Sequence, residues 1–452
     1  MIEKKYLYWV SLIIFAILYF VWPTIHTLIL KKVLLVSGAG LAIYFWIKSS
    51  ERKIILSSSW LMYSGLLLAW VIFHATFLTQ SGGAYPFVLS DYGSGAPRGA
   101  WREFLGQWVP AYVALLAGIG CALACRTFPE RKFNIYLMVM LASPSIFYLF
   151  FTVIKAVYTG EIVTGFDNWG ITDHKMSLTF YANLLAAGAC AKIIDAVKSG
   201  EKFSRITWWS LPIALAFYVA FFSDSLNGFI LVGGCVLLTV AAVVYMNRKN
   251  IPAGAWAIAV LLSGVFLYAL GTSAYVAAKR EVLVSTTRIA LDIDTYTHWR
   301  NVSQFGLPKD EHGVQVTESL YLRMAYATAG LRTIVEHPWG YGVTRKAFER
   351  LIQQKYPGAS IANSHNGYID LVSAVGFPAL ILLALMVISV FRQLRRSSSE
   401  WARPAMWMIG LIAVHWMIDP ISRDHYFETT LFLIGLFATL TLERKAEHAG
   451  QT

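Results

Sequence analysis

Long apolar runs dominate the sequence and constrain its fold. A transmembrane helix needs about 20 mostly apolar residues, and twelve runs approach or reach that length, at residues 6–22, 25–47, 56–78, 104–125, 134–157, 176–196, 207–222, 226–246, 254–277, 366–391, 404–420 and 426–442. Only 14% of the 452 residues are charged and 57% are hydrophobic, whereas a soluble domain carries about 25% charged residues. The runs therefore predict an all-α polytopic membrane protein with about 12 transmembrane helices.

The basic residues predict which way the spans face, because cytoplasmic loops of membrane proteins are enriched in Lys and Arg. With the N-terminus in the cytoplasm, 20 of the 38 basic residues fall on that side. They lie near both termini and in the loops 48–55, 126–133, 192–206, 247–253 and 392–403. An even number of spans then returns the C-terminus to the cytoplasm as well.

One long loop on the opposite side divides the chain into three parts. We expect spans 1–9 over residues 1–277, a helical loop domain over 278–365, and spans 10–12 with a cytoplasmic tail over 366–452. The loop holds eleven of the other 18 basic residues and eight acidic ones. The enrichment of cytoplasmic loops in Lys and Arg does not hold for long loops, so a basic outer loop agrees with the predicted orientation. An outer domain that collects arginines suggests a bound anion.

Arg323 is the loop arginine with no acidic neighbour along its own predicted helix. Residues 318–337 have helical spacing and stop at Pro338. Ala327 and Gly330 share the face of Arg323, so a partner can approach closely. Three other arginines have an acidic residue four positions on, a pairing that stabilises helices: Arg332 with Glu336, Arg345 with Glu349 and Arg288 with Asp292. We therefore expect Arg323 to meet an external anion, the alternative being a solvated loop charge.

His365 stands where the loop turns into the tenth span, in Asn363-Ser364-His365-Asn366-Gly367. Ser364 or Asn363 would cap the membrane helix that follows. A helix N-terminus attracts phosphate, and its field favours a neutral imidazole that can accept a proton, whereas a bound pyrophosphate has the opposite effect. The alternative is a capping or core histidine. Asp370 is expected to be an acid favoured by the helix dipole rather than a catalytic group.

Other motifs favour neither a metal nor a nucleotide. Asp292-Ile293-Asp294 resembles the DxD metal motif of nucleotide-sugar transferases, but a three-residue match is common and the segment lies outside the cytoplasm. No cluster has metal-ligand spacing, and no Walker-type glycine loop occurs. The four cysteines all fall within or at the ends of spans, which predicts no disulfide framework. We expect no metal and no cofactor.

Two motifs carry a resemblance to a known family. HPWGYG at 337–342 and HNGYIDLVSAVG at 365–376, in a multispan chain with a large late loop, resemble the bacterial O-antigen ligase and polymerase superfamily, most like the ligase. The sequence-level likeness covers roughly 318–376. Related proteins often carry a Ser-Arg pair at the outer start of an earlier span, whereas residues 223–228 here contain no arginine. A second phosphate contact must then come from elsewhere.

The resemblance implies an inverting, metal-independent glycosyltransferase with a GT-C-like fold. Its donor would be polysaccharide linked to undecaprenyl diphosphate, and its acceptor a sugar hydroxyl of lipid A–core in lipopolysaccharide biosynthesis. The site would face the periplasm from the bacterial inner membrane, among membrane lipids and with no nucleic acid. His365 would be the general base, supported by Ser364 and Asn366. The diphosphate would meet basic side chains: Arg323 first, then Arg288, Lys175 and Arg345.

Three alternatives remain. An O-antigen polymerase would use a second lipid-linked glycan as acceptor, and no residue separates it from the ligase. A polytopic anion or lipid transporter would carry charged residues at mid-membrane depth, whereas here the charges cluster at the outer mouth and in the loop. A membrane scaffold has no need of the loop arginines.

Overall fold

The protein is described by a computed structural model that covers residues 2–24, 27–78, 96–127, 130–160, 175–201, 203–223, 225–247, 274–344, 346–420 and 424–442. Within these ranges the chain is almost entirely helical, and extended pairing is limited to an isolated bridge between Lys309 and Gln315. The all-α prediction is therefore confirmed.

In the described part of the chain, seven helices are long and apolar enough to cross a membrane. They lie within α2 (Leu28–Lys48), α4 (Ser59–Phe73) with its π-helical extension η1 (His74–Leu78), α6 (Ala96–Cys125), α7 (Glu130–Thr159), α8 (Lys175–Lys198), α10 (Leu226–Asn247) and α16 (Gly367–Arg396). Four other predicted spans form α1 (Ile2–Val21), α9 (Phe203–Phe222), α17 (Ala402–His415) and α18 (Asp424–Leu440). Most of the remaining predicted span, residues 254–273 of 254–277, lies outside the described residues.

The bundle is held together by close contacts between helices. A Cβ on Gly118 of α6 would lie 2.1 Å from the Phe432 carbonyl oxygen of α18, and one on Gly435 would lie 2.4 Å from that of Leu115. Small residues allow such backbone contact, which is a main source of helix association in membranes. The four cysteines are buried and free, as predicted.

Loops predicted to share the cytoplasmic side lie together at one end of the bundle. Arg126 pairs with Glu51 at 3.1 Å and donates to the Thr439 carbonyl at 2.9 Å. Lys192 pairs with Glu400 at 3.3 Å. These contacts involve the ends of the fourth, sixth and twelfth predicted spans and the loops 48–55 and 392–403. Which end faces the cytoplasm remains a prediction.

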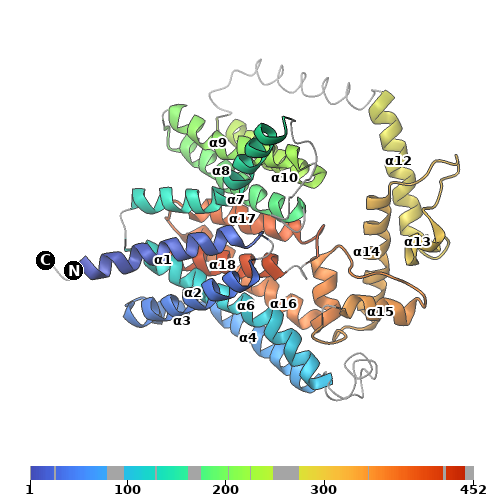
Figure 1. Cartoon of the computed structure of the whole chain (residues 1–452), viewed down its shortest axis with the longest axis horizontal. Helices are drawn as coiled ribbons and strands as arrows, with labels where there is room; N and C mark the ends of the chain where they lie inside the picture. Colours follow the sequence, from blue (N-terminus) through green and yellow to red (C-terminus); the bar gives the residue numbers. More distant parts are fainter. Residues whose placement is uncertain are drawn as a thin grey trace.

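The loop domain gathers at the other end of the molecule (Figure 1, yellow and orange). It contains α12 (Ala274–Leu291), the 3-10 turn η3 (Thr297–Arg300), α13 (Val302–Phe305), α14 (Glu318–Glu336) and α15 (Ala347–Lys355). Its apolar core includes Trp299 and Tyr321 and continues into Ile369 and Val372 of α16. The loop is therefore packed directly onto the start of a membrane helix. The helix predicted over 318–337 is confirmed by α14.

A break in α16 receives the HPWGYG segment, residues 337–342. Gly376 has a non-helical backbone (φ 76°), and Pro378 lacks the N–H that would bond the Ala374 carbonyl. The Gly342 N–H donates to that carbonyl at 3.0 Å instead. In return the Phe377 N–H donates to the Pro338 carbonyl at 2.9 Å. The loop thus replaces the hydrogen bonds that the helix loses.

The two glycines at this break meet backbone to backbone. A Cβ on Gly340 would lie 2.6 Å from the Gly376 nitrogen, and one on Gly376 would lie 2.6 Å from the Trp339 carbonyl carbon. Both have positive φ, a region that disfavours other residues. His74 fixes the same loop, its Nε2 lying 2.9 Å from the Trp339 oxygen. The first half of α16 is thereby held at a set angle.

Candidate functional site

His365 lies at the mouth of α16 in a strained backbone conformation. Its φ of 54° makes it the one non-glycine residue with positive φ in the described part of the chain. Such a residue costs about 1–3 kcal/mol and persists only where its surroundings hold it. The Asn363 side-chain oxygen accepts the His365 N–H at 3.1 Å. The conformation that presents this half-buried imidazole therefore lowers the folding stability of the loop.

Ser364 anchors the residue next to it. The Ser364 N–H donates to Asp370 Oδ1 at 3.0 Å, and its hydroxyl lies 2.7 Å from the same oxygen. That hydroxyl also accepts the Asn366 N–H at 3.0 Å. The carboxyl group of Asp370, in the first turn of α16, therefore holds the loop against the helix. This fits the expectation that Asp370 is structural.

The cap of α16 is Asn366, not Ser364 or Asn363 as the sequence suggested. The Asn366 side chain accepts from the N–H groups of Tyr368 at 3.0 Å and Ile369 at 3.2 Å. Because His365 turns the backbone into the left-handed region, the helix starts two residues later than a Ser364 cap would give. Asn363 and Ser364 hold the turn instead.

The C-terminal turn after α17 joins Arg323 to this loop. Helix ends leave carbonyls without helical partners, and three consecutive carbonyls here are bonded by groups of the site. Trp416 O accepts from the Gly367 N–H at 2.7 Å and Met417 O from Asn366 Nδ2 at 3.2 Å. Ile418 O accepts from Arg323 Nη1 at 2.7 Å. Arg323 and Asn366 therefore reach adjacent carbonyls of one turn.

Tyr326 provides a second link between α14, which carries Arg323, and His365. It lies one turn along α14 from Arg323, and its ring stacks on the His365 imidazole with an interplanar angle of 6° and centroids 6.1 Å apart. Burial, and secondarily the charge on Glu318, raises the pKa of Tyr326 to about 12. The ring is thus a neutral phenol at physiological pH.

Gly330 lets α14 approach α16 as its position predicted. A Cβ there would lie 2.7 Å from Ile369 Cγ2 and 3.0 Å from Phe348 Cε2. Ile369 is in the first turn of α16, four residues after His365. Close packing therefore fixes the helix of Arg323 relative to the helix that follows His365.

The other predicted phosphate contacts are not brought to this site by the described structure. Arg288 is 72% exposed at the end of α12 and pairs with Glu311 at 3.7 Å, not with Asp292 as its spacing suggested. Arg345 and the side chain of Lys175 lie outside the described part. Their roles stay predictions.

A second local pairing was also wrong. Arg332 pairs with Asp294 at 2.7 Å, while Glu336 pairs with Lys355 at 2.5 Å. Both pairs cross between elements of the loop domain. Asp294 belongs to the DxD-like sequence, so one of its two carboxylates is part of a surface ion pair. Among the described residues, no group of three His, Cys, Asp or Glu is arranged to hold a metal.

An apolar cavity of about 210 Å³ opens beside the site between α16, α17 and α18. Tyr368 and Trp416 lie at its polar end, and the Tyr368 hydroxyl donates to the Ala413 carbonyl at 2.8 Å. From there the lining continues along α16 to Leu383 and Ile388. The polar groups around His365 are thus next to an apolar cavity that runs along the candidate membrane span α16.

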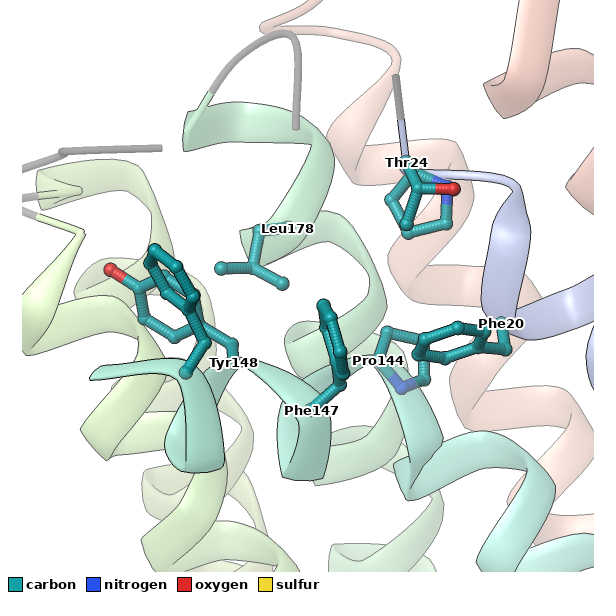
Figure 2. A pocket seen from close by; sticks show the side chains of 8 residues that line it. Phe20, Thr24, Pro144, Phe147, Tyr148 and Leu178 are labelled. Carbon is teal, nitrogen blue, oxygen red and sulfur yellow. The ribbon is translucent and has the colours of Figure 1, made fainter. Parts of the chain in front are cut away.

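A smaller cavity at another place serves packing only. It lies between α1, α7 and α8, where Phe20, Phe147 and Leu178 converge (Figure 2). Its volume of about 10 Å³ matches one water molecule at most, and its lining carries no charged side chain. We assign it no function.

Sequence reasoning missed three parts of the site. Asn363 was taken for a helix cap, although an Asn two residues before a bonded N–H is also typical of an Asx turn. Tyr326 lies three residues after Arg323, so helical spacing placed it on the same face. The carbonyls of 416–418 had no sequence signature, because any residue supplies a backbone oxygen.

Residues 211–384 match the family model described as O-antigen ligase. The matched segment contains Arg323, Tyr326 and His365 and ends within α16. A comparison with curated proteins gave no significant match. The family match confirms the resemblance to the O-antigen ligase and polymerase superfamily.

Proposed function

Because the chain carries an O-antigen ligase family domain, we propose that it is a glycosyltransferase of the ligase type. It would transfer polysaccharide from undecaprenyl diphosphate to a sugar hydroxyl of lipid A–core. The observation that carries the proposal is the strained His365 backbone, maintained by directed hydrogen bonds beside Arg323. Strain of this kind marks functional sites.

His365 is the proposed general base. The acceptor hydroxyl oxygen forms a bond to the anomeric carbon of the donor sugar, while the bond from that carbon to the diphosphate oxygen breaks. The hydroxyl proton passes to the imidazole, and the bonding electrons leave with the diphosphate. Attack opposite the leaving group inverts the configuration. Proton transfer to a positioned group contributes about 10²–10⁴-fold to such rates.

Arg323 is the proposed electrostatic partner of the leaving diphosphate. Its bond to the Ile418 carbonyl, at 2.7 Å, fixes where the guanidinium charge lies. The N-terminus of α16 adds a partial positive charge at the same mouth. Fixed positive charge of this kind stabilises the negative charge that develops in the transition state. Such a site requires no divalent ion.

The apolar cavity supports a lipid-linked donor. Its polar end at Tyr368 and Trp416 adjoins the loop that holds His365, and its walls are aliphatic. An isoprenoid chain could lie there with its diphosphate at the mouth. With both termini in the cytoplasm, this mouth would face the periplasm from the inner membrane.

The acceptor decides between ligase and polymerase. Purified protein would be given lipid-linked polysaccharide together with lipid A–core, and then each lipid alone. We expect a gel shift of lipid A–core only in the complete mixture. Longer glycan chains without lipid A–core would support the polymerase. If neither product formed, the proposal of glycosyl transfer would be contradicted.

His365→Asn tests the base directly. Asparagine tolerates the left-handed backbone but cannot take up the proton, so the loop is kept and the chemistry removed. We expect transfer to fall by about 100-fold or more with an unchanged thermal midpoint. His312→Asn, at an exposed histidine of the same domain, serves as control. Equal rates for His365→Asn and wild type would refute the assignment.

A further inference from the structure

A large cavity lies at the end of α16 opposite His365. Its volume is about 1140 Å³, and it is formed by α7, α8, α9 and the segment from the end of α16 to the start of α17. The part of α16 after the break at Gly376, about 20 residues up to Arg396, alone spans roughly 30 Å. The cavity is therefore separate from the site described above.

The cavity lies at the level where three candidate spans end. The span in α7 begins at Phe133, next to Asn134 of the lining. The span in α8 ends at Lys198 and that in α16 at Arg396, so Lys198 and Arg395 of the lining lie at their last residues. Three such ends at one cavity place it at a membrane–water boundary.

One wall of the cavity is apolar and faces outward. Ile135 is 60% exposed, Val139 58% and Trp208 64%. These side chains belong to α7 and α9, whose apolar surfaces would contact lipid. A soluble protein would not leave such a wall open beside a large cavity, but acyl chains would cover it in a bilayer.

A second part of the lining, the polar wall, is polar and basic. Lys192 pairs with Glu400 and Arg403 with Asp195, so these charges are largely compensated. Lys198 and Arg395 are exposed to solvent, and the lining contains one further carboxylate, that of Glu201. Ser398 and Ser399 line the same wall, whereas the hydroxyl of the neighbouring Ser397 donates to the Thr441 carbonyl at 2.7 Å. The wall thus combines excess positive charge with hydrogen-bond donors, as phosphate recognition requires.

We propose that this cavity binds an anionic glycerophospholipid. Its phosphate would lie against Arg395, Lys198 and the hydroxyls of Ser398 and Ser399, and its acyl chains along Ile135, Val139 and Trp208. Basic cavities between membrane helices are suited to such headgroups. A free phosphate would use only the polar wall, whereas a lipid uses both. The proposal does not depend on the identity of the glycosyl acceptor.

The test uses full-length protein in detergent and two pure lipids. Phosphatidylglycerol and phosphatidylethanolamine of matched chain length would be titrated separately, and inorganic phosphate would form a third arm. Bound lipid is counted by native mass spectrometry, and the thermal midpoint is followed in parallel. We expect phosphatidylglycerol to bind about tenfold more tightly than phosphatidylethanolamine and to raise the midpoint. Inorganic phosphate should leave the midpoint unchanged.

Two adjacent arginines provide a matched pair of variants. Arg395 lines the cavity, whereas the exposed Arg396 does not. Arg395→Gln, alone and combined with Lys198→Gln, should weaken phosphatidylglycerol binding about tenfold, while Arg396→Gln should bind as wild type does. The lipid-free midpoint reports whether each variant folds, and single Arg395→Gln replaces the double variant if that one does not. Equal binding of both lipids, equal loss in Arg396→Gln, or an equal shift with inorganic phosphate would each overturn the proposal.

Discussion

The two ends of α16 use charge in opposite ways. At the N-terminal end, near His365, the His365 N–H donates to the Asn363 side chain and Arg323 donates to the Ile418 carbonyl. At the other end, Arg395 lies in solvent at the rim of a large cavity. One end is densely hydrogen-bonded and the other is open to solvent.

The difference fits what we propose that each end binds. A transition state exists for an instant, so stabilising charges must be in place beforehand. A lipid headgroup can be met by mobile side chains, because the ligand itself orders them on binding. The comparison predicts that substitutions at the His365 end change the rate of transfer or the stability of the fold, and that those at exposed cations have little effect on transfer.

The largest effect is expected at the break in α16. Gly376→Ala would place a Cβ 2.6 Å from backbone of Trp339 at a φ of 76°, and backbone cannot move aside cheaply. We expect a loss of more than about 3 kcal/mol in folding stability, beyond the roughly 0.5–3 kcal/mol typical of single substitutions. The yield of folded protein and the thermal midpoint would show it.

Gly313, elsewhere in the loop domain, serves as a control that separates the cost of a positive φ from the cost of a steric clash. Gly313 has a φ of 80°, but a Cβ added there would meet only open space. Gly313→Ala therefore carries only the conformational cost, about 1 kcal/mol. If both variants lost the same stability, the close contact between Gly340 and Gly376 would not be what holds the first half of α16.

Arg323→Gln is expected to lower transfer about 100-fold, the lower end of the range for one lost donor to the negative charge of a transition state. Arg323→Lys should retain part of the rate because it keeps a charge without the guanidinium fork. Initial rates at varied donor concentration would measure both. Arg332→Gln, on the same helix but paired with Asp294, should stay near wild type. A similar loss in Arg332→Gln would mean that α14 itself had been disturbed.

The sequence predicted helices and their faces well, because periodicity and stop residues are local. The end of α14 at Pro338 and the close approach at Gly330 followed from spacing alone. The partners of charged residues did not follow. Arg332 has a carboxylate four residues on, yet its partner is Asp294, 38 residues away. Folding of the loop brings that carboxylate closer than helical spacing does.

The helix cap shows a second limit. Asn363, Ser364 and Asn366 are all good capping residues, so composition alone could not choose among them. The choice depends on the backbone of His365, which lies in a region that sequence propensity disfavours. Sequence reasoning thus found the loop and its histidine, but not the strain that sets their geometry.

Asn363→Ala tests whether that strain matters to the rate. The variant removes the acceptor of the His365 N–H and leaves the imidazole in place. A lost hydrogen bond of this kind is worth about 1 kcal/mol, so we expect roughly a fivefold lower rate and a small fall in thermal midpoint. Asn363→Asp keeps the oxygen and should restore most of the rate. Full activity in Asn363→Ala would show that the turn is held without this bond.

The smallest effect is expected at Arg288, the first candidate for a second phosphate contact. Its guanidinium is 72% exposed and lies 3.7 Å from an equally exposed Glu311, and such surface pairs contribute about 0–1 kcal/mol. We therefore expect Arg288→Gln to change transfer less than about twofold, measured beside Arg323→Gln at the same donor concentrations. Because an exposed pair is screened by salt, any effect should shrink at higher ionic strength. A loss above about tenfold that persists in salt would place Arg288 on the diphosphate, and the densely hydrogen-bonded end of the molecule would then extend to α12.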